Sequence, residues 1–251
     1  MEVHAHSHTE RKKFIHYLWE FFMLFLAVTL GFLVENMREH LMDQKKERSY
    51  IQSLLSDLKK DTTIIGVVTK AHFKLIRGED SLIDALNNYR DIDSINRRCY
   101  RYYFRYATAC PKVVFNERTM SQLLNSGNMR LIHKQSVSDS IMDYNSVVKY
   151  VQDQGNAYEE YFKKALDFSE NIFDFGYTQN TLTNDYTVKP KLQLAKTNFI
   201  LLSKDPAIFK KYTNDMSLLI GVLETYMFAV KNAKEKATQL IAFLQKEYHL
   251  E

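Results

Sequence analysis

The chain has 251 residues, and only 7 of them are glycine and 3 proline. This scarcity excludes turn-rich β sandwiches, β barrels and glycine-lined nucleotide folds, and it favours long helices. Hydrophobic residues at 45 % and charged residues at 25 % exclude wholesale disorder, and a formal charge of +4 is too small by itself to indicate a nucleic-acid-binding protein.

The N-terminal tail, residues 1–13, combines three alternating histidines with a basic end. His4, His6 and His8 are close enough in sequence to chelate Zn²⁺, Cu²⁺ or Ni²⁺. The tail has no cysteine and no fixed fourth ligand, so the alternative is a solvated segment that binds metal only adventitiously. We favour this alternative and expect no physiological metal and no cofactor.

Residues 14–34, FIHYLWEFFMLFLAVTLGFLV, are the strongest membrane signal of the chain. As a helix they extend about 31 Å, enough to cross the hydrocarbon core of a bilayer. Trp19 and Glu20 lie near one end, where an aromatic belt and snorkelling polar groups belong. A cleaved signal peptide lacks its cleavage motif, and a buried core helix fits poorly because phenylalanines surround the helix. The sequence therefore predicts a single transmembrane anchor.

Two features of the anchor allow alternative interpretations. An intramembrane carboxylate such as Glu20 can relay protons, although its place beside the aromatic belt favours an interfacial position. Ala27 and Gly31 form a small-xxx-small pair that lets two spans approach closely, which supports self-association or contact with another membrane protein. Basic residues are nearly balanced on the two sides, but the contiguous run at 11–13 favours a cytoplasmic N-terminus.

Helical periodicity continues after the anchor. Residues 35–49 are almost wholly polar and charged and predict a helical stalk, and residues 50–251 predict a helical bundle domain. Gly78 is expected to end the first bundle helix. Further helices are expected over residues 81–88, 93–108 and 117–125, from a cap at Ser136 or Ser138 to about Phe173, and after Pro206.

The last two segments differ sharply in pattern. Residues 174–191 are rich in Asn, Thr and Tyr, have no apolar period, and are expected to form one long loop. The helix after Pro206 has the clearest amphipathic pattern, with spacings suited to an antiparallel seam. Its apolar positions are Phe209, Tyr212, Met216, Leu219, Leu223, Met227, Val230, Ala233, Ala237, Leu240 and Leu244. The predicted fold class is all-α: an N-terminal transmembrane helix that continues into an antiparallel helical bundle.

Basic and aromatic residues are interleaved between positions 97 and 106. Such a mixture can grip single-stranded nucleic acid. On a helix, however, Arg97, Arg101 and Arg105 form one outward stripe, opposite an inward stripe that contains Cys99. An anionic partner surface or lipid headgroups fit this pattern better, and we expect no nucleic acid partner.

Cys99 and Cys110 are the two cysteines of the chain. On an unbroken helix their Cα atoms would lie about 16 Å apart, whereas a disulfide needs less than about 7 Å. Two buried thiols are therefore favoured. A disulfide would require the helix to end early and fold back, and it would indicate a non-cytoplasmic domain.

Common enzyme signatures do not occur in the sequence. It contains no GxxxxGK[ST], GxGxxG, GxSxG, HExxH or CxxC motif. A catalytic site would have to be built from residues that no motif singles out. We therefore expect a protein that is not an enzyme.

Two blocks of the sequence resemble a group of single-pass inner-membrane proteins of Bacteroidota bacteria. The first, ENMREHLMDQKKERSYIQSLLSDLKKD, covers residues 35–61 and follows a span that bears Glu20. The second, NERTMSQLLNSGNMRLI, covers residues 116–132 and contains a helix ended by Ser126 and Gly127. The group has no assigned activity, so the resemblance implies the architecture and an inner-membrane location. Physically, Gly127 would be a left-handed helix stop, and the Leu-Ile pair after it would dock into the core.

Two functions from different classes fit these observations. The first is an accessory or scaffold subunit of an inner-membrane assembly, with its N-terminus in the cytoplasm and its bundle in the periplasm. The alternative is a single-pass sensor whose bundle, in a chain with 16 tyrosines, binds a small ligand and signals through a partner protein.

Overall fold

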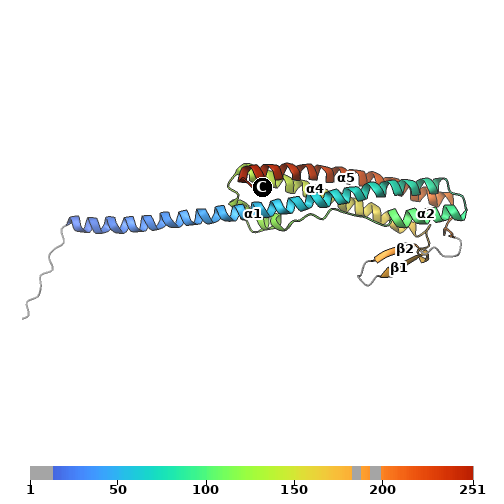
Figure 1. The fold of residues 1–251 in the computed structure, drawn as a ribbon, viewed down its shortest axis with the longest axis horizontal. Coiled ribbons are helices and arrows are strands. Elements are labelled where there is room, and N and C mark those ends of the chain that lie inside the picture. Colours follow the sequence, from blue (N-terminus) through green and yellow to red (C-terminus); the bar gives the residue numbers. More distant parts are fainter. Residues whose placement is uncertain (1–13, 183–187, 193–198, 251) are drawn as a thin grey trace, which may run out of the picture. The chain divides into compact units, whose positions relative to one another are not determined.

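The computed structural model describes residues 14–182, 188–192 and 199–250 (Figure 1). The chain divides into two compact units, residues 1–50 and 51–251, and helix α1, Phe14–Asn87, contributes to both. Five α-helices contain most of the described residues, which confirms the all-α fold class predicted from the sequence.

In the first unit, α1 is helical throughout the predicted stalk, residues 35–49. Polar side chains one turn apart interact along it. Nε of Arg38 donates a hydrogen bond to Glu35 at 2.9 Å, and Nε2 of His40 lies 3.0 Å from the side-chain amide of Gln44. Pairs with this spacing support a helix in which most side chains are exposed to solvent.

The second unit is a helical bundle in which the chain runs through four successive segments, which we call arms. The first arm is α1 from residue 51 to its end. The second arm consists of α2, Asp93–Tyr106, an extended segment at 107–117, and the short α3, Arg118–Asn125. After a 3₁₀ turn, η1, Asn128–Leu131, the third and fourth arms are α4, Gln135–Ser169, and α5, Pro206–Tyr248.

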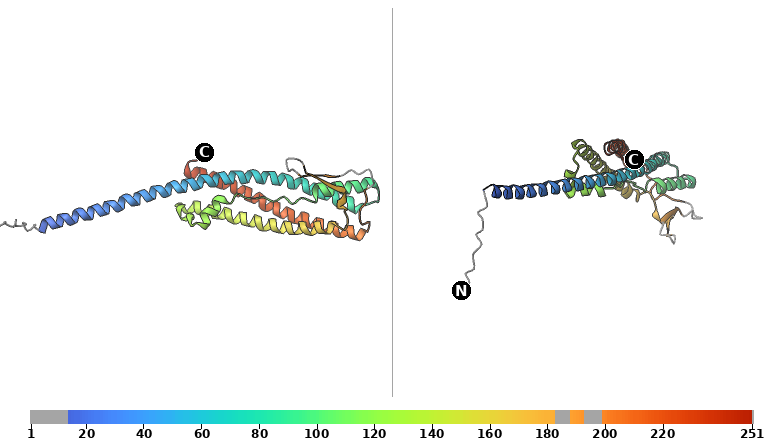
Figure 2. Two further views of the ribbon diagram at one scale, coloured as in Figure 1. Left: turned by 90° about the horizontal axis from the view of Figure 1, so that it is seen from below. Right: turned by 60° about the vertical axis from the view of Figure 1, so that its left-hand side comes forward.

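Helices α4 and α5 lie side by side in opposite directions (Figure 1 and Figure 2). At the start of α4, Nζ of Lys134 lies 2.8 Å from a carboxylate oxygen of Glu247 near the end of α5. Near the end of α4, Nζ of Lys164 lies 3.7 Å from Asp215 in the first turns of α5. These two contacts at opposite ends of the pair establish the antiparallel packing.

The core follows the apolar stripes of the helices. The apolar positions predicted for α5 are all buried except Met227, which is half-buried. Aromatic rings close the end of the bundle near α2, where Tyr103 stacks on Phe173 with ring centroids 4.1 Å apart. Tyr100 meets the same Phe173 ring edge-on at 5.3 Å. Burial of such rings contributes both apolar area and specific ring geometry to the core.

Gly78 is not a helix stop, contrary to the expectation from the sequence, because α1 continues through it to Asn87. The glycine is needed for packing instead. A Cβ atom at Gly78 would lie 2.0 Å from Cγ of Tyr106, so the ring at the end of α2 packs directly against the backbone of α1. The absence of a side chain therefore sets the close approach of these two helices.

Two helix boundaries also differ from the predicted ones. Neither Ser136 nor Ser138 caps α4, whose N-cap is Lys134 without a side-chain hydrogen bond, and α4 ends at Ser169 rather than near Phe173. Helix α5 has the stronger start signal. Asp205 accepts a hydrogen bond from the backbone N–H of Ala207 at 2.8 Å, and a proline occupies the first turn.

The segment expected to be one long loop, residues 174–191, contains regular structure. A short 3₁₀ helix, η2, Phe175–Tyr177, leads into strand β1, Thr178–Leu182, which pairs antiparallel with β2, Val188–Leu192. Threonine is frequent in this segment, and such β-branched residues suit extended strands. A two-stranded hairpin does not need the apolar period whose absence suggested a loop.

Candidate functional site

The segment predicted as an anchor forms a wholly exposed apolar surface. Among the described residues, α1 is the one helix that is long and apolar enough to cross a membrane, and none of its most apolar stretch is buried in the structure. The alternative of a buried core helix therefore does not hold for residues 14–34. Trp19 is exposed and stacks on Phe22 with ring centroids 6.3 Å apart. An apolar surface of this extent indicates contact with lipid or with another protein.

The other anchor residues keep the positions expected from the helix. Nε2 of His16 lies 3.3 Å from a carboxylate oxygen of Glu20, so the acid has a polar neighbour one turn away. Ala27 is exposed, and a Cβ atom added at Gly31 would meet no other atom within 4 Å. The small-xxx-small face is thus open to a second helix.

The turn after α3 has the geometry that the sequence suggested. Ser126 is the C-cap of α3, and Gly127 has a φ of +64°, in the left-handed region that favours glycine. Leu131 and Ile132 after the turn are buried. The turn therefore directs the chain back into the bundle core.

A polar junction ties the extended segment and α3 to α1. Asp61 of α1 is 3 % exposed, and its Oδ1 accepts hydrogen bonds from the backbone N–H of Asn116 at 2.8 Å and from its side-chain amide at 2.6 Å. The hydroxyl of Tyr144 in α4 donates to the other oxygen at 3.4 Å. Burial raises the pKa of Asp61, and the hydrogen bonds from Asn116 oppose that shift.

Asp57, one turn earlier in α1, completes this junction. Its carboxylate accepts from the hydroxyl of Thr119 at 2.5 Å, from the backbone N–H of Thr119 at 3.4 Å and from Arg118 at 3.3 Å. The backbone contact engages one of the free N–H groups at the start of α3. The two sequence blocks that carry the family resemblance, 35–61 and 116–132, therefore contact each other here.

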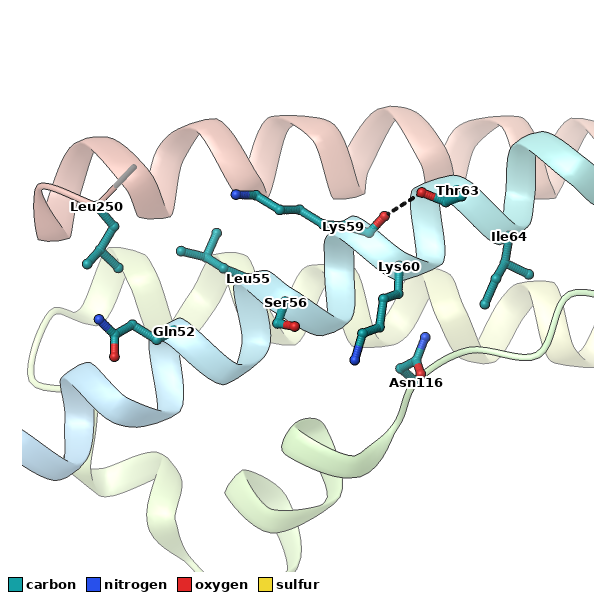
Figure 3. Close-up of a pocket in the computed structure, with 9 residues that line it drawn as sticks. All are labelled: Gln52, Leu55, Ser56, Lys59, Lys60, Thr63, Ile64, Asn116 and Leu250. Atoms are coloured by element: carbon teal, nitrogen blue, oxygen red, sulfur yellow. Dashed lines mark hydrogen bonds between the residues drawn. The ribbon is translucent and has the colours of Figure 1, made fainter.

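Two cavities of very different size adjoin the junction. A small one, about 20 Å³, lies between Asp57, Asp61 and Tyr144 and has room for about one water molecule. The larger is an open groove of about 800 Å³ along α1, with Lys60 directed toward Asn116 (Figure 3). The groove is lined by Gln52, Leu55, Ser56, Lys59, Lys60, Thr63, Ile64, Asn116 and Leu250. It combines apolar walls with two cations, so its chemistry suits an anionic amphipathic ligand.

His72 lies in the bundle interior on the inner side of α1. Its Nε2 is 2.8 Å from the carbonyl oxygen of Pro111, which can only accept, so Nε2 carries the proton. Its Nδ1 has no hydrogen-bond partner among the described residues, and the rings of Tyr158 and Tyr226 meet the imidazole edge-on. Burial lowers the pKa of His72, which favours the neutral ring.

Glu79, two turns further along α1, is the least satisfied acid in the described part of the chain. It is 1 % exposed, and neither carboxylate oxygen has a hydrogen-bond partner there. Burial, with a smaller contribution from Asp80, raises the pKa of Glu79 to about 7. Burial without a hydrogen-bond partner therefore favours the protonated form of this carboxyl group.

The two cysteines are free thiols in the structure. Cys99 is buried in α2, and burial raises the pKa of its thiol to about 11. Cys110 is half-buried in the extended segment, after α2 has ended at Tyr106. The helix does end early, but the chain continues away in extended form rather than folding back to Cys99. Raised pKa values keep both thiols protonated and unreactive.

The arginine stripe of α2 is only partly a free surface. Arg101 and Arg105 are exposed, in agreement with an outward stripe. Arg97 is half-buried, donates to Asp93 at 2.7 Å and places its guanidinium 4.9 Å from the ring centroid of Phe199. Arg97 therefore belongs to the packing of α2.

The metal candidates His4, His6 and His8 lie outside the described residues. Within the described ranges, no group of three or more His, Cys, Asp or Glu side chains is placed to hold a metal ion.

The buried acids on the inner face of α1 were not identified from the sequence, although the sequence contains a signal for them. Asp61 follows Leu58 by three residues and Glu79 follows Leu75 by four, so both fall on the apolar stripe of α1.

No family model, no curated protein and no solved structure matches the chain. Its function is therefore inferred from the geometry of its own residues.

Proposed function

We propose that the chain is a non-enzymatic, single-pass protein of the bacterial inner membrane whose helical bundle is an accessory or scaffold subunit of a membrane assembly. The observation that carries this proposal is the exposed apolar surface of α1 over residues 14–34. A helix of this length satisfies its own backbone hydrogen bonds, and bilayer lipid covers its side chains without cost.

The interior of the bundle supports a structural role. Its polar groups are buried behind the helices, and the junction acids Asp57 and Asp61 are engaged in holding the extended segment and α3. His72 and Glu79 are sealed from solvent as well. A catalytic acid or base must reach a substrate, whereas these groups face only the chain itself. The bundle is suited to presenting a surface.

The proposed topology has the N-terminus in the cytoplasm and the bundle in the periplasm. It is supported by the contiguous basic run at 11–13 beside the span. The family resemblance of the two sequence blocks favours an inner-membrane location. Within the membrane, the open face at Ala27 and Gly31 is suited to self-association or to contact with the span of another protein.

The test begins with the full-length protein in its native membranes. We expect it to stay in the pellet after an alkaline carbonate wash and to be extracted only by detergent. Affinity purification in mild detergent followed by mass spectrometry is expected to recover a stoichiometric partner. Replacing residues 14–34 by an unrelated span of equal length tests whether the span recognises that partner. A chain released by carbonate would contradict the anchor, and a pure homo-oligomer would contradict the accessory role.

The groove along α1 favours a second function, a sensor of a small ligand. Its volume of about 800 Å³ falls in the range of ligand sites, and Lys59 and Lys60 supply positive charge. A ligand bound only by the folded state raises the melting temperature. Thermal shifts of the detergent-solubilised full chain with a panel of anionic metabolites therefore distinguish this function, which requires a saturable increase, from the scaffold role, which requires none.

A further inference from the structure

Between residues 51 and 77 the outer face of α1 carries positive charge and no negative charge; the exposed acids of α1 within the bundle, Asp80 and Asp84, lie beyond this stretch. Between residues 51 and 77 the exposed positions are Gln52, Ser56, Lys59, Lys60, Thr63, Val67, Lys70, Phe73, Lys74 and Arg77. Five of these ten side chains are cationic and none is anionic. We name these ten residues the basic face. It is about 38 Å long at ~1.5 Å per residue.

The cations of the basic face have no acidic partners in the described part of the chain. The acids of the same stretch, Asp57 and Asp61, are buried in the polar junction. None of the five cations forms an ion pair with a described residue. By contrast, Lys163 of α4 and Lys211 of α5 each pair with an acid one turn away. The basic face thus has unneutralised charge that a partner can satisfy.

Helix α5 adds a sixth cation beside this face. Gly66 of α1 has no side chain, and a Cβ atom there would lie 4.0 Å from Nζ of Lys234. The ammonium group of Lys234 therefore lies over the backbone of α1, between the cations of the first turns and Lys70. It too forms no ion pair with a described residue.

Apolar side chains interrupt the cations at regular places. Val67 is 66 % exposed and Phe73 is 60 % exposed. At one end of the face, the groove of about 800 Å³ offers apolar walls from Leu55, Ile64 and Leu250 (Figure 3). A narrow strip with cations at helical spacing and apolar positions between them is complementary to an amphipathic helix that carries acids.

We infer that the basic face receives an acidic amphipathic helix of a partner protein, laid along α1. This inference rests on the proposed function as a scaffold and names the chemistry of its partner. Lys70, Lys74 and Arg77 follow each other at spacings of four and three residues, so the partner helix carries Asp or Glu at the same helical spacing. Its apolar side chains cover Val67 and Phe73.

A helix fits the charge pattern better than a broad anionic surface such as a lipid bilayer. The exposed charge of α5 beside α1 is mixed, with Glu224 and Glu235 among lysines such as Lys231 and Lys236, whereas the exposed charges of residues 51–77 of α1 are all cationic. The purely cationic strip is therefore about one helix wide, which suits a helix better than a broad surface. A single helix, about 10 Å wide, contacts the strip on α1 without covering the far side of α5.

The binding test uses the full-length protein in nanodiscs of neutral phosphatidylcholine. The probe is a fluorescent 28-residue peptide with Glu at three- and four-residue spacing on one face and Leu beside it, and its control has Gln in place of Glu. We expect saturable binding of the Glu peptide by fluorescence anisotropy and at least about tenfold weaker binding of the Gln peptide. Equal binding of the two peptides would overturn the inference.

Charge reversal locates the site. The variant K70E/K74E/R77E is expected to weaken binding of the Glu peptide by at least about tenfold. The control K149E/K210E/K246E makes the same change in net charge at exposed lysines of α4 and α5, and it is expected to stay within about threefold of wild type. Equal losses in both variants would indicate non-specific charge attraction and overturn the inference. If the reversal variant melts early, K70Q/K74Q/R77Q answers the same question.

Two further readouts separate this inference from its rivals. Flotation with phosphatidylglycerol vesicles that depends on Lys70, Lys74 and Arg77, together with no peptide binding, would assign the face to lipid and overturn the inference. In cells, a partner retained by the K70E/K74E/R77E variant in the membrane would overturn this inference but leave the scaffold role intact. A wild-type chain released by carbonate would instead overturn the anchor, while the peptide assay would still report on the basic face.

Discussion

Asp61 in α1 and Asn116 in the extended segment form a two-point contact across 55 residues of sequence. One carboxylate oxygen accepts both the backbone N–H of Asn116 at 2.8 Å and its side-chain amide at 2.6 Å. Two donors on one residue fix both the position and the orientation of the chain just before α3 begins. The contact therefore determines where the irregular second arm joins the bundle.

Replacing Asp61 by alanine is expected to lower the free energy of unfolding by about 2 kcal/mol, because it leaves the half-buried N–H groups of Asn116 without their acceptor. Chemical denaturation of the detergent-solubilised full chain, followed by circular dichroism, measures the change. The control is Asp153→Ala, which removes an exposed acid from α4 and is expected to change stability by less than about 0.5 kcal/mol. Equal effects of the two variants would show that the junction does not stabilise the bundle.

Two helical glycines are expected to respond in opposite ways to alanine. Gly78→Ala places a Cβ atom 2.0 Å from Cγ of Tyr106, and overpacking of this kind is expected to destabilise the bundle by about 3 kcal/mol. Gly221→Ala adds a methyl group where no other atom lies within 4 Å, and the better helix propensity is expected to stabilise by about 0.5 to 1 kcal/mol. Thermal melting of both variants tests the contrast. Stabilisation by both would mean that Tyr106 does not pack closely on α1.

The sequence predicts those elements whose signal is local and repeated. Helix α5 repeats its apolar positions over many turns, so one misplaced residue, Met227, leaves the pattern intact. Gly127 could be assigned because a Ser-Gly pair ended a short helical pattern. The role of Gly78 could not be assigned from the sequence, since a glycine that ends a helix and a glycine that allows close packing have the same local sequence. The difference lies in Tyr106, which meets Gly78 only in the folded bundle.

In the candidate site, too, features with a local sequence signal can be predicted and features that depend on long-range contacts cannot. The apolar span at 14–34 can be predicted from the sequence because all its residues contribute to the hydropathy of one continuous segment. The polar junction and the groove cannot be predicted in this way, because each is assembled from segments that are distant in the sequence. The groove joins one face of α1 to Asn116 and to Leu250 near the C-terminus. No local period encodes such a meeting, although an acid on an apolar stripe, such as Asp61, indicates that a buried partner exists.

Stability is expected to fall with rising pH because of Glu79. An unfolded chain releases this proton near pH 4.5, whereas burial in the folded bundle raises the pKa to about 7. Between these values the folded state holds the extra proton, so its stability decreases as pH rises and stays low above about pH 7. The total loss is about 3 kcal/mol. Glu79→Gln removes the charge and is expected to be more stable than wild type by about this amount at pH 8.

Among the described residues, no cation contributes to the pKa of Glu79. Glu79 is influenced by Asp80 on the same helix and in turn influences Tyr158 of α4, Tyr212 of α5 and Cys110, all of which are neutral or negative. The contribution of His72 to stability has the opposite pH dependence. Because burial lowers the pKa of His72 in the folded chain, the free energy of unfolding increases as pH rises toward 6.5. The difference between wild type and Glu79→Gln, measured by denaturation from pH 5 to 8, cancels the histidine contribution.

A matched control for this pH profile is Glu224→Gln, which neutralises an exposed acid of α5. Its profile is expected to run parallel to wild type, because the substitution is on the surface and leaves the buried carboxyl group of Glu79 in place. A Glu79→Gln profile that also runs parallel to wild type would show that Glu79 is solvated or paired in solution.

The orientation of the chain can be measured with single cysteines in a background where Cys99 and Cys110, both free thiols, are replaced by serine. We place one cysteine at the exposed Asn214 of α5 and one at Ser7 of the tail. The basic run at the end of the tail favours a cytoplasmic N-terminus and a periplasmic bundle, so a membrane-impermeant maleimide is expected to label the Asn214→Cys variant in intact spheroplasts. The Ser7→Cys variant is expected to react only after lysis. The reverse pattern would place the bundle in the cytoplasm, and labelling of both variants in intact spheroplasts would show that the chain does not span the membrane.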